Sequence, residues 1–437
     1  MRSTPSSSPR ASRRDFIKTS TLVGGALAFG IATPPRLFAQ NSETLRVGLV
    51  GCGGRGSGAA RDALNADPNC VLVAVGDVFE SVAKGAVAAM KREASMAERV
   101  TVTPETTFSG LDAYQKVIAA GVDVVLLCTP PGFRPLHLKA AVDAGKHVFC
   151  EKPMATDVPG VRSVFESAAR AKEKRLALVA GFCWRFDQAC REFYSRVHDG
   201  MIGDIRHYHA TYLSGPVKPM PPASTRPAGM GDVEWQLRNW YNFVWVCGDG
   251  LVEQACHSVD KIAWAMNGVL PVKCVANGGR NVPNHEGNIF DHIDVFYEFP
   301  EGVRATMAQR QISNCYTDNS DYLLGSTGVG RCGWNAPTIT GQNNWRYRGR
   351  NPGAEMYVQE HRELFASIRK GEPRNDGVWM TNSTLMAIMG RTAAYTGQEI
   401  TWEQIMASTE KLVPDDLRWD QALPVPPMAV PGKTRFV

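Results

Sequence analysis

The sequence predicts an α/β protein with an N-terminal doubly wound parallel sheet and a C-terminal α+β domain that carries an open-faced mixed or antiparallel sheet. Three observations support this. Apolar strands alternate with helices up to about residue 180, a glycine-rich turn follows the first strand, and residues 291–307 alternate with period two. The chain has 437 residues, 44% hydrophobic and 21% charged, a composition typical of a globular protein.

The first 39 residues are predicted to be a twin-arginine signal peptide and not part of the fold. Residues 12–18, Ser-Arg-Arg-Asp-Phe-Ile-Lys, have the twin-arginine pattern, and an apolar run rich in small residues follows at 21–32. This run is shorter than the ~20 residues that a membrane span needs. We therefore expect export to the periplasm, with no membrane anchor after the signal is removed.

The charge distribution gives no reason to expect a nucleic-acid partner. The formal net charge is +5, from 48 Lys and Arg against 43 Asp and Glu. Six of these basic residues and one acidic residue lie in residues 1–39, which leaves 42 of each in the remainder. A protein that binds a phosphate backbone needs a basic surplus, and the predicted mature chain has none.

The 11 cysteines are expected to be mostly free, buried thiols. Several, such as Cys128, Cys150 and Cys274, lie in apolar runs, where a thiol packs as a small hydrophobic side chain. No two cysteines form a C-x-x-C pair or a zinc-like cluster, so no metal site is predicted. A chain that is exported already folded need not pair its thiols in an oxidising compartment.

The first predicted domain, residues 44–180, repeats strand and helix. Runs rich in Val and Leu without polar alternation predict buried strands at 45–50, 71–75, 122–128, 146–150 and 176–179. Helical stretches lie between them at 59–64, 111–120, 136–144 and 161–174. This repetition favours a parallel sheet with helices on both faces.

The second predicted domain, residues 181–420, has a different pattern. Apolar and polar residues alternate over 291–299, a Pro-Glu-Gly turn follows at 300–302, and the alternation resumes at 303–307. This predicts an antiparallel hairpin with one covered face. Residues 214–233 are rich in Pro, Gly and Met and are expected to form a long loop. Helices are expected again at 356–370 and 381–395.

The turn after the first strand, Gly-Cys-Gly-Gly-Arg-Gly, is predicted to bind the pyrophosphate of a dinucleotide. It fits G-x-G-x-x-G between a strand and a helix, as in Rossmann folds. Gly51 allows the tight turn, Gly53 lets the backbone approach a phosphate, and Gly56 lets the helix pack on the strand. Gly54 and Arg55 lie between them, where the helix N-terminus faces the phosphates.

Asp77 is predicted to bind the ribose of this dinucleotide. It ends the second strand, 21 residues after Gly56, close to the ~20 expected of an acid that binds a ribose 2′-hydroxyl. A carboxylate there would repel a 2′-phosphate, so NAD is predicted over NADP. NADP stays open because Arg55 can soften that preference.

Lys152 and His257 are the predicted chemical groups. Glu151, Lys152 and a proline follow the strand at 146–150, and ligands of such sheets bind outside the carboxyl ends of the strands. Further along the chain, Glu253 and His257 are four residues apart, which places them on one helix face where a carboxylate can orient an imidazole. An imidazole accepts a proton near neutral pH, and an ammonium stabilises a developing alkoxide.

Several motifs together resemble the Gfo/Idh/MocA oxidoreductases, over roughly residues 45–400. They are the turn at 51–56, Thr129-Pro130, residues 144–147, Glu151-Lys152-Pro153 and the stretch 250–260. The resemblance implies an NAD(P)-dependent oxidoreductase whose cofactor borders Thr129, Pro130, Glu151 and Lys152. It also implies that Lys152 and His257 are catalytic, and that Glu253 stands where the family usually has an aspartate, one methylene shorter.

Four further residues are weaker candidates for contacts with a carbohydrate substrate. Trp184 could stack on the C–H face of a sugar, and Arg185, Asp291 and His292 could hydrogen-bond its hydroxyls. A core role for the tryptophan and a strand-end role for Asp291 and His292 stay open. The two residues at 260–261, Asp-Lys, are expected to form helix-surface or capping contacts.

Three functions stay open at this stage. The favoured one is a sugar or polyol oxidoreductase. The second is an NAD-dependent glycoside-cleaving enzyme, similar to the α-N-acetylgalactosaminidase branch of the family, which works by transient oxidation, elimination, hydration and reduction. The third is a non-catalytic, dinucleotide-carrying sugar-binding protein. Export implies that the cofactor stays bound and is regenerated within one cycle. An open-faced sheet often buries its face against another subunit, so a homodimer or homotetramer is expected.

Overall fold

The computed structural model describes residues 43–282, 285–350 and 355–437, so the predicted signal peptide, residues 1–39, lies outside the described residues. Within them, a first sheet has six strands, all paired in parallel, in the order β3-β2-β1-β4-β5-β6. The strands are β1 (Leu45–Val50), β2 (Cys70–Asp77), β3 (Thr107–Ser109), β4 (Val124–Leu127), β5 (His147–Cys150) and β6 (Leu178–Ala180). The helices that connect them are α1 (Gly54–Ala66), α2 (Glu80–Lys91), α3 (Ala113–Ala119), α4 (Arg134–Asp143) and α5 (Val158–Glu173).

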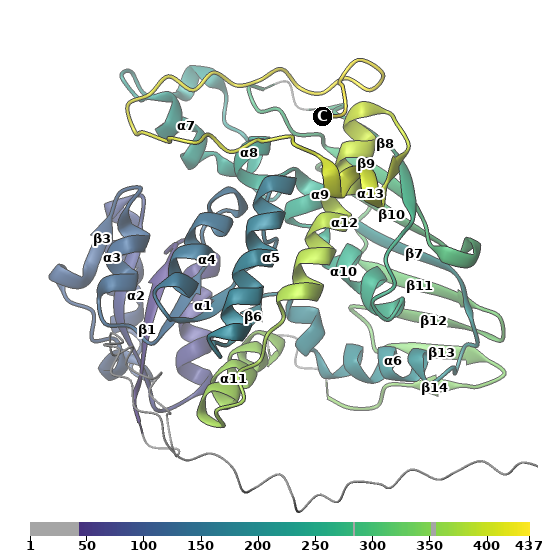
Figure 1. Cartoon of the computed structure of the whole chain (residues 1–437), viewed down its shortest axis with the longest axis horizontal. Helices are drawn as coiled ribbons and strands as arrows, with labels where there is room; N and C mark the ends of the chain where they lie inside the picture. The colour runs from purple at the N-terminus through teal and green to yellow at the C-terminus, as the bar shows by residue number, and fades with distance from the viewer. Residues whose placement is uncertain (1–42, 283–284, 351–354) are drawn as a thin grey trace, which may run out of the picture. The chain divides into compact units, whose positions relative to one another are not determined.

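The first sheet is covered on both faces, which explains its continuous apolar strands. All four residues of β4 are fully buried, and successive residues enter different apolar clusters: Val124 and Leu126 one cluster, Val125 and Leu127 the other. The cluster that contains Val124 and Leu126 also includes side chains of α11 (Glu355–Arg369), which packs against α1 (Figure 1). A helix from late in the chain thus completes the core around the first sheet.

The second sheet is mixed. Among the described residues it has nine strands in the order β14-β13-β12-β11-β7-β10-β9-β8-β15, in which β10 and β7 are parallel and the other neighbouring pairs are antiparallel. The strands are β7 (Ile205–Ser214), β8 (Lys273–Gly279), β9 (His292–Glu298), β10 (Arg304–Gln311), β11 (Ser320–Gly325), β12 (Gly328–Gly333), β13 (Thr338–Gly341), β14 (Trp345–Arg346) and β15 (Ile400–Thr401). The remaining helices are α6 (Gln188–His198), α7 (Asp232–Arg238), α8 (Val244–Cys247), α9 (Gly250–Glu253), α10 (Cys256–Ala265), α12 (Gly377–Thr396) and α13 (Trp402–Ala407).

These two sheets confirm the predicted fold class. β9 and β10 form the expected antiparallel hairpin around the turn at 300–302, and Ile293, Val295 and Tyr297 are buried as the alternation requires. The three-residue edge strand β3 was not predicted, because Thr-Phe-Ser is too short and too polar to give a strand pattern. No helix of the described residues is long and apolar enough to cross a membrane.

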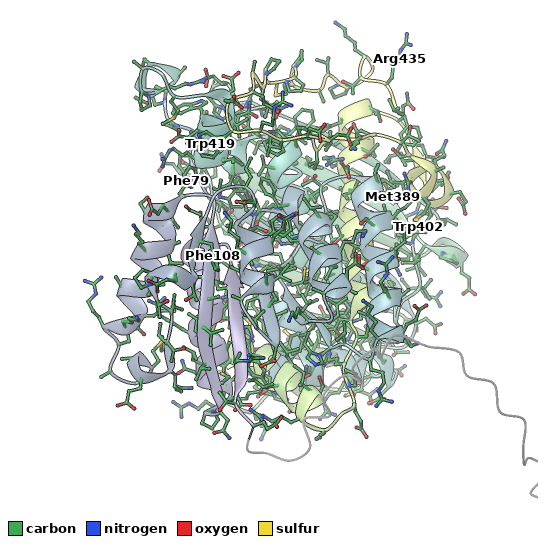
Figure 2. All side chains as sticks on the ribbon, turned by 60° about the vertical axis from the view of Figure 1, so that its left-hand side comes forward. Phe79, Phe108, Met389, Trp402, Trp419 and Arg435 are labelled. Carbon is green, nitrogen blue, oxygen red and sulfur yellow. The ribbon has the colours of Figure 1, made fainter. Side chains whose placement is uncertain are left out.

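The chain after α13 is an extended tail without helix or strand in residues 408–437. In Figure 1 it is the yellow segment that runs past α7 and α8. Figure 2 shows that this tail brings Trp419 next to Phe79, a residue of the first sheet's β2–α2 connection. Residues far apart in the sequence therefore meet at the carboxyl end of β2.

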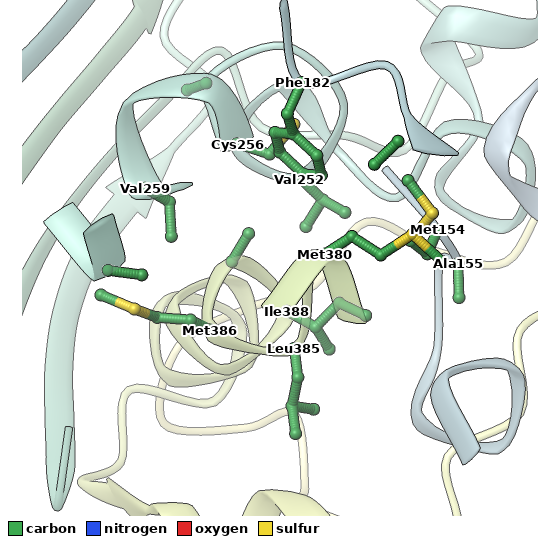
Figure 3. Packing of buried hydrophobic residues seen from close by; sticks show 14 of the residues in the cluster. Met154, Ala155, Phe182, Val252, Cys256, Val259, Met380, Leu385, Met386 and Ile388 are labelled. Atoms are coloured by element: carbon green, nitrogen blue, oxygen red, sulfur yellow. The ribbon is translucent and has the colours of Figure 1, made fainter. Parts of the chain in front are cut away.

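Helix α12 is the centre of a core that joins the two sheets. Leu385, Met386 and Ile388 are fully buried, and the helix packs against α5, α10 and β8. Figure 3 shows side chains of α12 with Met154, which follows β5, and with Val259 of α10. A helix that is apolar on all sides is stable only when it is enclosed, and this enclosure holds the ends of β5 and α9 together.

Candidate active site

The turn between β1 and α1 has the backbone of an anion-binding site. Gly51 adopts φ +90°, and a Cβ on Gly56 would lie 1.8 Å from the carbonyl oxygen of Gly51, so neither position accepts a side chain. A Cβ on Gly53 or Gly54, in contrast, would meet nothing within 4 Å. The first N–H groups of α1 have no side-chain cap and are left to bind an anion in this open cradle.

Asp77 is held at the carboxyl end of β2 by the neighbouring backbone. Its Oδ2 accepts the Cys52 N–H at 2.7 Å, and its Oδ1 accepts the Phe79 N–H at 3.0 Å. Burial raises the pKa of Asp77 above its usual value, and the backbone donors oppose that rise. Each carboxylate oxygen keeps a second lone pair, so Asp77 can still accept a ribose hydroxyl.

Arg55 is committed to other carboxylates. Its Nε contacts Glu151 Oε1 at 2.5 Å, its Nη2 contacts Glu360 Oε1 at 3.4 Å, and its Nη1 lies 3.5 Å from Asp62. Its guanidinium also lies 4.7 Å from the centroid of the Tyr357 ring. The charge that was expected to soften the NAD preference is therefore balanced within this cluster, which ties α1 to α11 and to the end of β5.

A cavity of about 600 Å³ runs from this turn to the end of β5 and to α9 and α10. It is lined by every residue predicted for cofactor binding and catalysis: Gly51, Gly53, Gly54, Arg55, Gly56, Asp77, Thr129, Pro130, Glu151, Lys152, Glu253 and His257. The open cradle, the free helix N-terminus and the buried acid fit the pyrophosphate and ribose of a dinucleotide. Among the described residues, no group of three or more His, Cys, Asp and Glu side chains could hold a metal ion.

Lys152 is the buried cation of this cavity. Its Nζ donates to the backbone carbonyl of Glu253 at 2.5 Å and lies 3.2 Å from Glu253 Oε1. Burial lowers the pKa of Lys152, but Glu253 together with the nearby Cys256, Glu151 and Tyr212 outweighs burial, and the pKa rises to about 12. An ammonium has three donors, so one N–H remains for a substrate oxygen.

The pKa of His257 is shifted in the opposite direction to that of Lys152. Its side chain is buried, its Nδ1 has no hydrogen-bond partner among the described residues, and the Phe182 ring lies edge-on at 6.0 Å. Burial, and then the positive charges of Lys152 and Lys261, lower the pKa of His257 well below 6.5. At neutral pH the imidazole is therefore uncharged and able to accept a proton.

The expected Glu253–His257 pairing is wrong. The helix is interrupted, since α9 ends at Glu253 and α10 begins at Cys256, so the four-residue spacing does not bring the two side chains into hydrogen-bond contact. Glu253 turns to Lys152, and its Oε2 has no partner in the described part of the chain. Glu253 therefore sets the charge state of the lysine rather than the orientation of the histidine.

The four predicted sugar contacts do not line the cavity. Arg185 donates to both carboxylate oxygens of Asp260 at 2.8 Å and stacks on Trp264 and Trp379. Trp184 is 8% exposed and packs edge-on against Trp334. Paired and enclosed in this way, Arg185 and Trp184 stabilise the second domain.

The other two candidates shape a loop. Asp291 Oδ2 accepts the backbone N–H groups of Asn281 and Val282, and its Oδ1 lies 2.8 Å from His292 Nδ1. The expectation of surface contacts for Asp260 and Lys261 is also wrong, because both are 1% exposed. Lys261 forms a buried ion pair with Asp321 at 2.6 Å, a contact between distant elements that sequence spacing does not reveal.

Sequence reasoning missed several residues of the cavity wall. Gln254 donates to Tyr212 Oη at 2.6 Å beside Lys152, and Tyr357 comes from α11. The long loop and α7 add further lining residues: Val217, Lys218, Leu237, Arg238 and Trp240. The glutamine lies next to Glu253 in the family-like stretch, a signal that could have marked it. The other residues reach the cavity only through tertiary packing.

Comparison with known proteins agrees with this geometry. Residues 45–180 match the family model described as "Oxidoreductase family, NAD-binding Rossmann fold". An inositol 2-dehydrogenase of Rhizobium meliloti is 31% identical over 162 residues, 37% of this chain and 43% of that protein. A glycosyl hydrolase family 109 protein of Streptomyces coelicolor is 27% identical over 228 residues, 48% of this chain and 46% of its own length.

Solved structures show the same fold over a longer stretch. Levoglucosan dehydrogenase in complex with NADH and levoglucosan superposes with a TM-score of 0.65 at 16% identity, over 82% of this chain and 99% of that one. The chain spans about half the length of the curated relatives it matches, from 38% to 57%. The first domain thus matches the NAD-binding domain of an oxidoreductase family. The matching model is that of the Gfo/Idh/MocA family, and the match extends over residues 45–180.

Proposed function

We propose that the protein is an NAD-dependent oxidoreductase that oxidises a secondary hydroxyl of a sugar, polyol or glycoside. The observation that carries this proposal is the pair of oppositely tuned groups, Lys152 and His257, in the cavity that continues from the phosphate-binding turn. The inositol dehydrogenase relative and the levoglucosan complex support a carbohydrate substrate.

Lys152 and His257 divide the proton chemistry between them. The bound nicotinamide supplies the hydride acceptor. His257, uncharged at neutral pH, takes the hydroxyl proton as the C–H hydride leaves and the carbonyl forms. The remaining N–H of Lys152 donates to the same oxygen and stabilises the negative charge that develops on it, while Glu253 keeps this ammonium protonated. In the reverse direction Lys152 polarises the carbonyl and His257 returns the proton.

The proposal is tested by mixing purified protein with a panel of sugars, polyols and glycosides and following nicotinamide absorbance. We expect about one equivalent of reduction together with a ketosugar product. Lys152→Met and His257→Asn should each lower this step by about 100-fold or more. Lys139→Met, which removes an exposed lysine on α4, is the control and should leave it unchanged. Turnover that survives both site variants would contradict the assignment.

A second candidate is glycoside cleavage through transient oxidation, elimination, hydration and reduction. The match to the family 109 glycosyl hydrolase favours it. The same two residues would serve, because oxidation acidifies the neighbouring C–H and reduction regenerates the hydroxyl. Release of an aglycone from a glycoside without net nicotinamide reduction would support this cycle over simple oxidation.

We also propose export through the twin-arginine pathway, with the cofactor carried inside the folded protein. The pattern at residues 12–18 supports it. Replacement of both arginines by lysine should retain the protein in the cytoplasm of a bacterial host, as measured by fractionation. Mass spectrometry of small molecules released on denaturing the exported protein should then detect NAD.

The outer face of the second sheet supports a homodimer or homotetramer. Val275 and Phe296 are paired across β8 and β9, and Leu324 and Val329 across β11 and β12. Each of these four residues is at least 42% exposed, so each pair is an apolar patch on the sheet, and β7 and β10 lie between the two patches. Light scattering should detect an oligomer that the Phe296→Glu variant dissociates. A monomeric native protein would refute it.

A further inference from the structure

A second hollow continues the cofactor cavity beyond Asp77. The two share Val78, Phe79, Gly110, Leu111 and Arg238. In a dinucleotide fold the acid at the end of the second strand binds the adenosine ribose, so the adenine lies past this residue. The shared residues therefore place the second hollow at the adenosine end of the site.

Aromatic and cationic side chains from three distant segments meet there. Phe79 lies two residues after Asp77, and the ring of Trp419 meets it edge-on with centroids 5.8 Å apart (Figure 2). The guanidinium of Arg238, from α7, also lies over Phe79, 4.2 Å from the centroid of its ring. Trp419 is 39% exposed, which leaves surface for a ligand.

The tail that carries Trp419 is anchored on both sides of this residue. Before it, the Leu412 N–H donates to Asp157 at the start of α5 at 2.8 Å. After it, the Leu423 N–H donates to Asp232 at 3.0 Å, and Gln236 Nε2 donates to the Leu423 carbonyl at 2.6 Å. The position of Trp419 is thus built into the fold.

The charges of the hollow suit adenosine without a phosphate. Carboxylates of Glu80, Asp112 and Glu234 line it, and its Arg238 donates to Glu234 at 2.8 Å. A neutral purine can stack on the aromatic and guanidinium groups, whereas a 2′-phosphate would meet the carboxylate of Asp77. The three carboxylates of the hollow are each paired with a cation, Lys84, Lys116 or Arg238, and leave the hollow without a surplus of positive charge.

We propose that Trp419, together with Phe79 and Arg238, binds the adenosine end of NAD, and that the tail of residues 408–437 thereby keeps the dinucleotide from dissociating. The tail closes the outer end of a site whose inner end holds Lys152 and His257. This inference depends on nucleotide binding by the first domain, and not on the reaction proposed above.

The test is the rate at which NADH leaves the full-length protein. NADH-loaded protein is mixed with excess ADP-ribose, and the loss of bound-NADH fluorescence is followed. Trp419→Ala should release NADH about 10- to 100-fold faster, the range expected for loss of one base–aromatic contact. Trp334→Ala removes another exposed tryptophan, 69% exposed on the second domain, and should release NADH at the native rate.

Competition with AMP and with nicotinamide mononucleotide, the two halves of the dinucleotide, shows which end of the site Trp419→Ala weakens. In Trp419→Ala the affinity for AMP should fall about tenfold or more, while that for nicotinamide mononucleotide stays within about twofold. The proposal is overturned if Trp419→Ala releases NADH at the native rate. It is also overturned if this variant loses affinity equally for AMP and for nicotinamide mononucleotide. If the alanine variant does not fold, Trp419→Leu carries the same expectation. The assay needs no substrate, so failure of the proposed oxidation would leave its result intact.

Discussion

The ion pair between Lys152 and Glu253 yields the most demanding prediction. Glu253→Gln keeps the size of the side chain and the backbone carbonyl that Lys152 Nζ contacts, and it removes only the charge 3.2 Å away. Both side chains are 10% exposed, so the lysine that remains cannot be solvated fully. Burial then acts on the lysine against only the weaker effects of Cys256, Glu151 and Tyr212, and its pKa in the folded state should fall below 10.5.

The magnitude follows from the pair's geometry and pKa. A rise from 10.5 to about 12 corresponds to a net stabilisation of the ammonium of about 2 kcal/mol, to which Glu253 is the largest favourable contributor. Two charges 3.2 Å apart interact by about 5 kcal/mol at an effective dielectric constant of 20. Deprotonating Lys152 at pH 7, from a native pKa of about 12, limits the loss to about 7 kcal/mol. We expect Glu253→Gln to lower the free energy of unfolding by about 3–5 kcal/mol at pH 7.

The pH dependence of this loss distinguishes the ion pair from packing. In the native protein the folded pKa of Lys152 is raised, so its contribution is complete below pH 10.5 and is lost as pH rises towards 12. In Glu253→Gln the folded pKa lies below the unfolded value, so the unfolded state binds more protons and stability recovers with pH, by up to about 1.4 kcal/mol per unit.

Urea denaturation of both proteins between pH 7 and pH 10 measures this difference. The stability gap should narrow as pH rises. Glu80→Gln, which breaks an exposed i, i+4 pair with Lys84, should cost about 0.5 kcal/mol or less at every pH. A gap for Glu253→Gln that stays constant across the range would refute the reasoning.

Three further outcomes follow. Gly53→Ala should fold normally and bind NADH at least about tenfold more weakly, because its methyl group fills the empty cradle. Gly56→Ala places a Cβ 1.8 Å from a carbonyl oxygen and should lower the melting temperature as well. Equal melting temperatures of the two variants would count against this. Thiol titration of the denatured chain should find 11 free thiols, and nine or fewer would show a disulfide. His361→Phe keeps the stacking on Phe149 and removes two nitrogens without partners among the described residues, so stability at pH 7 should be unchanged or rise by about 1–2 kcal/mol. Burial lowers the pKa of His361 well below 6.5, so native stability falls as pH drops below 6.5, and this fall should be shallower in the variant when measured by urea denaturation.

Predictions that rest on adjacent residues agree with the structure. The strand–turn–helix around Gly51 and Gly56, the acid at Asp77 and the lysine after β5 are local patterns, and the ends of parallel strands lie at one edge of a sheet. These residues therefore share one cavity. The covered face of the β9–β10 hairpin followed from period-two alternation for the same reason.

Predictions that depended on spacing without knowledge of packing were less successful. The four-residue interval between Glu253 and His257 implied a shared helix face, but the helix breaks between them, and Glu253 pairs with a lysine 101 positions away. Arg185 was expected to be free for a sugar, and it pairs with Asp260, 75 positions away. A buried charged side chain pairs with an opposite charge that lies close to it in space, whatever the separation of the two residues in the sequence.

The sequence by itself determined the class of fold and the glycine-rich turn, and it predicted Lys152 and His257 as the chemical groups, because each depends on short-range periodicity or on residue type. Only the tertiary structure decided the charge states of Lys152 and His257, since these follow from burial and from charges on other elements. It also decided that α11 completes the first domain and that Trp419 meets Phe79. Such contacts arise when separate apolar surfaces are buried together, and no local pattern specifies which surfaces meet.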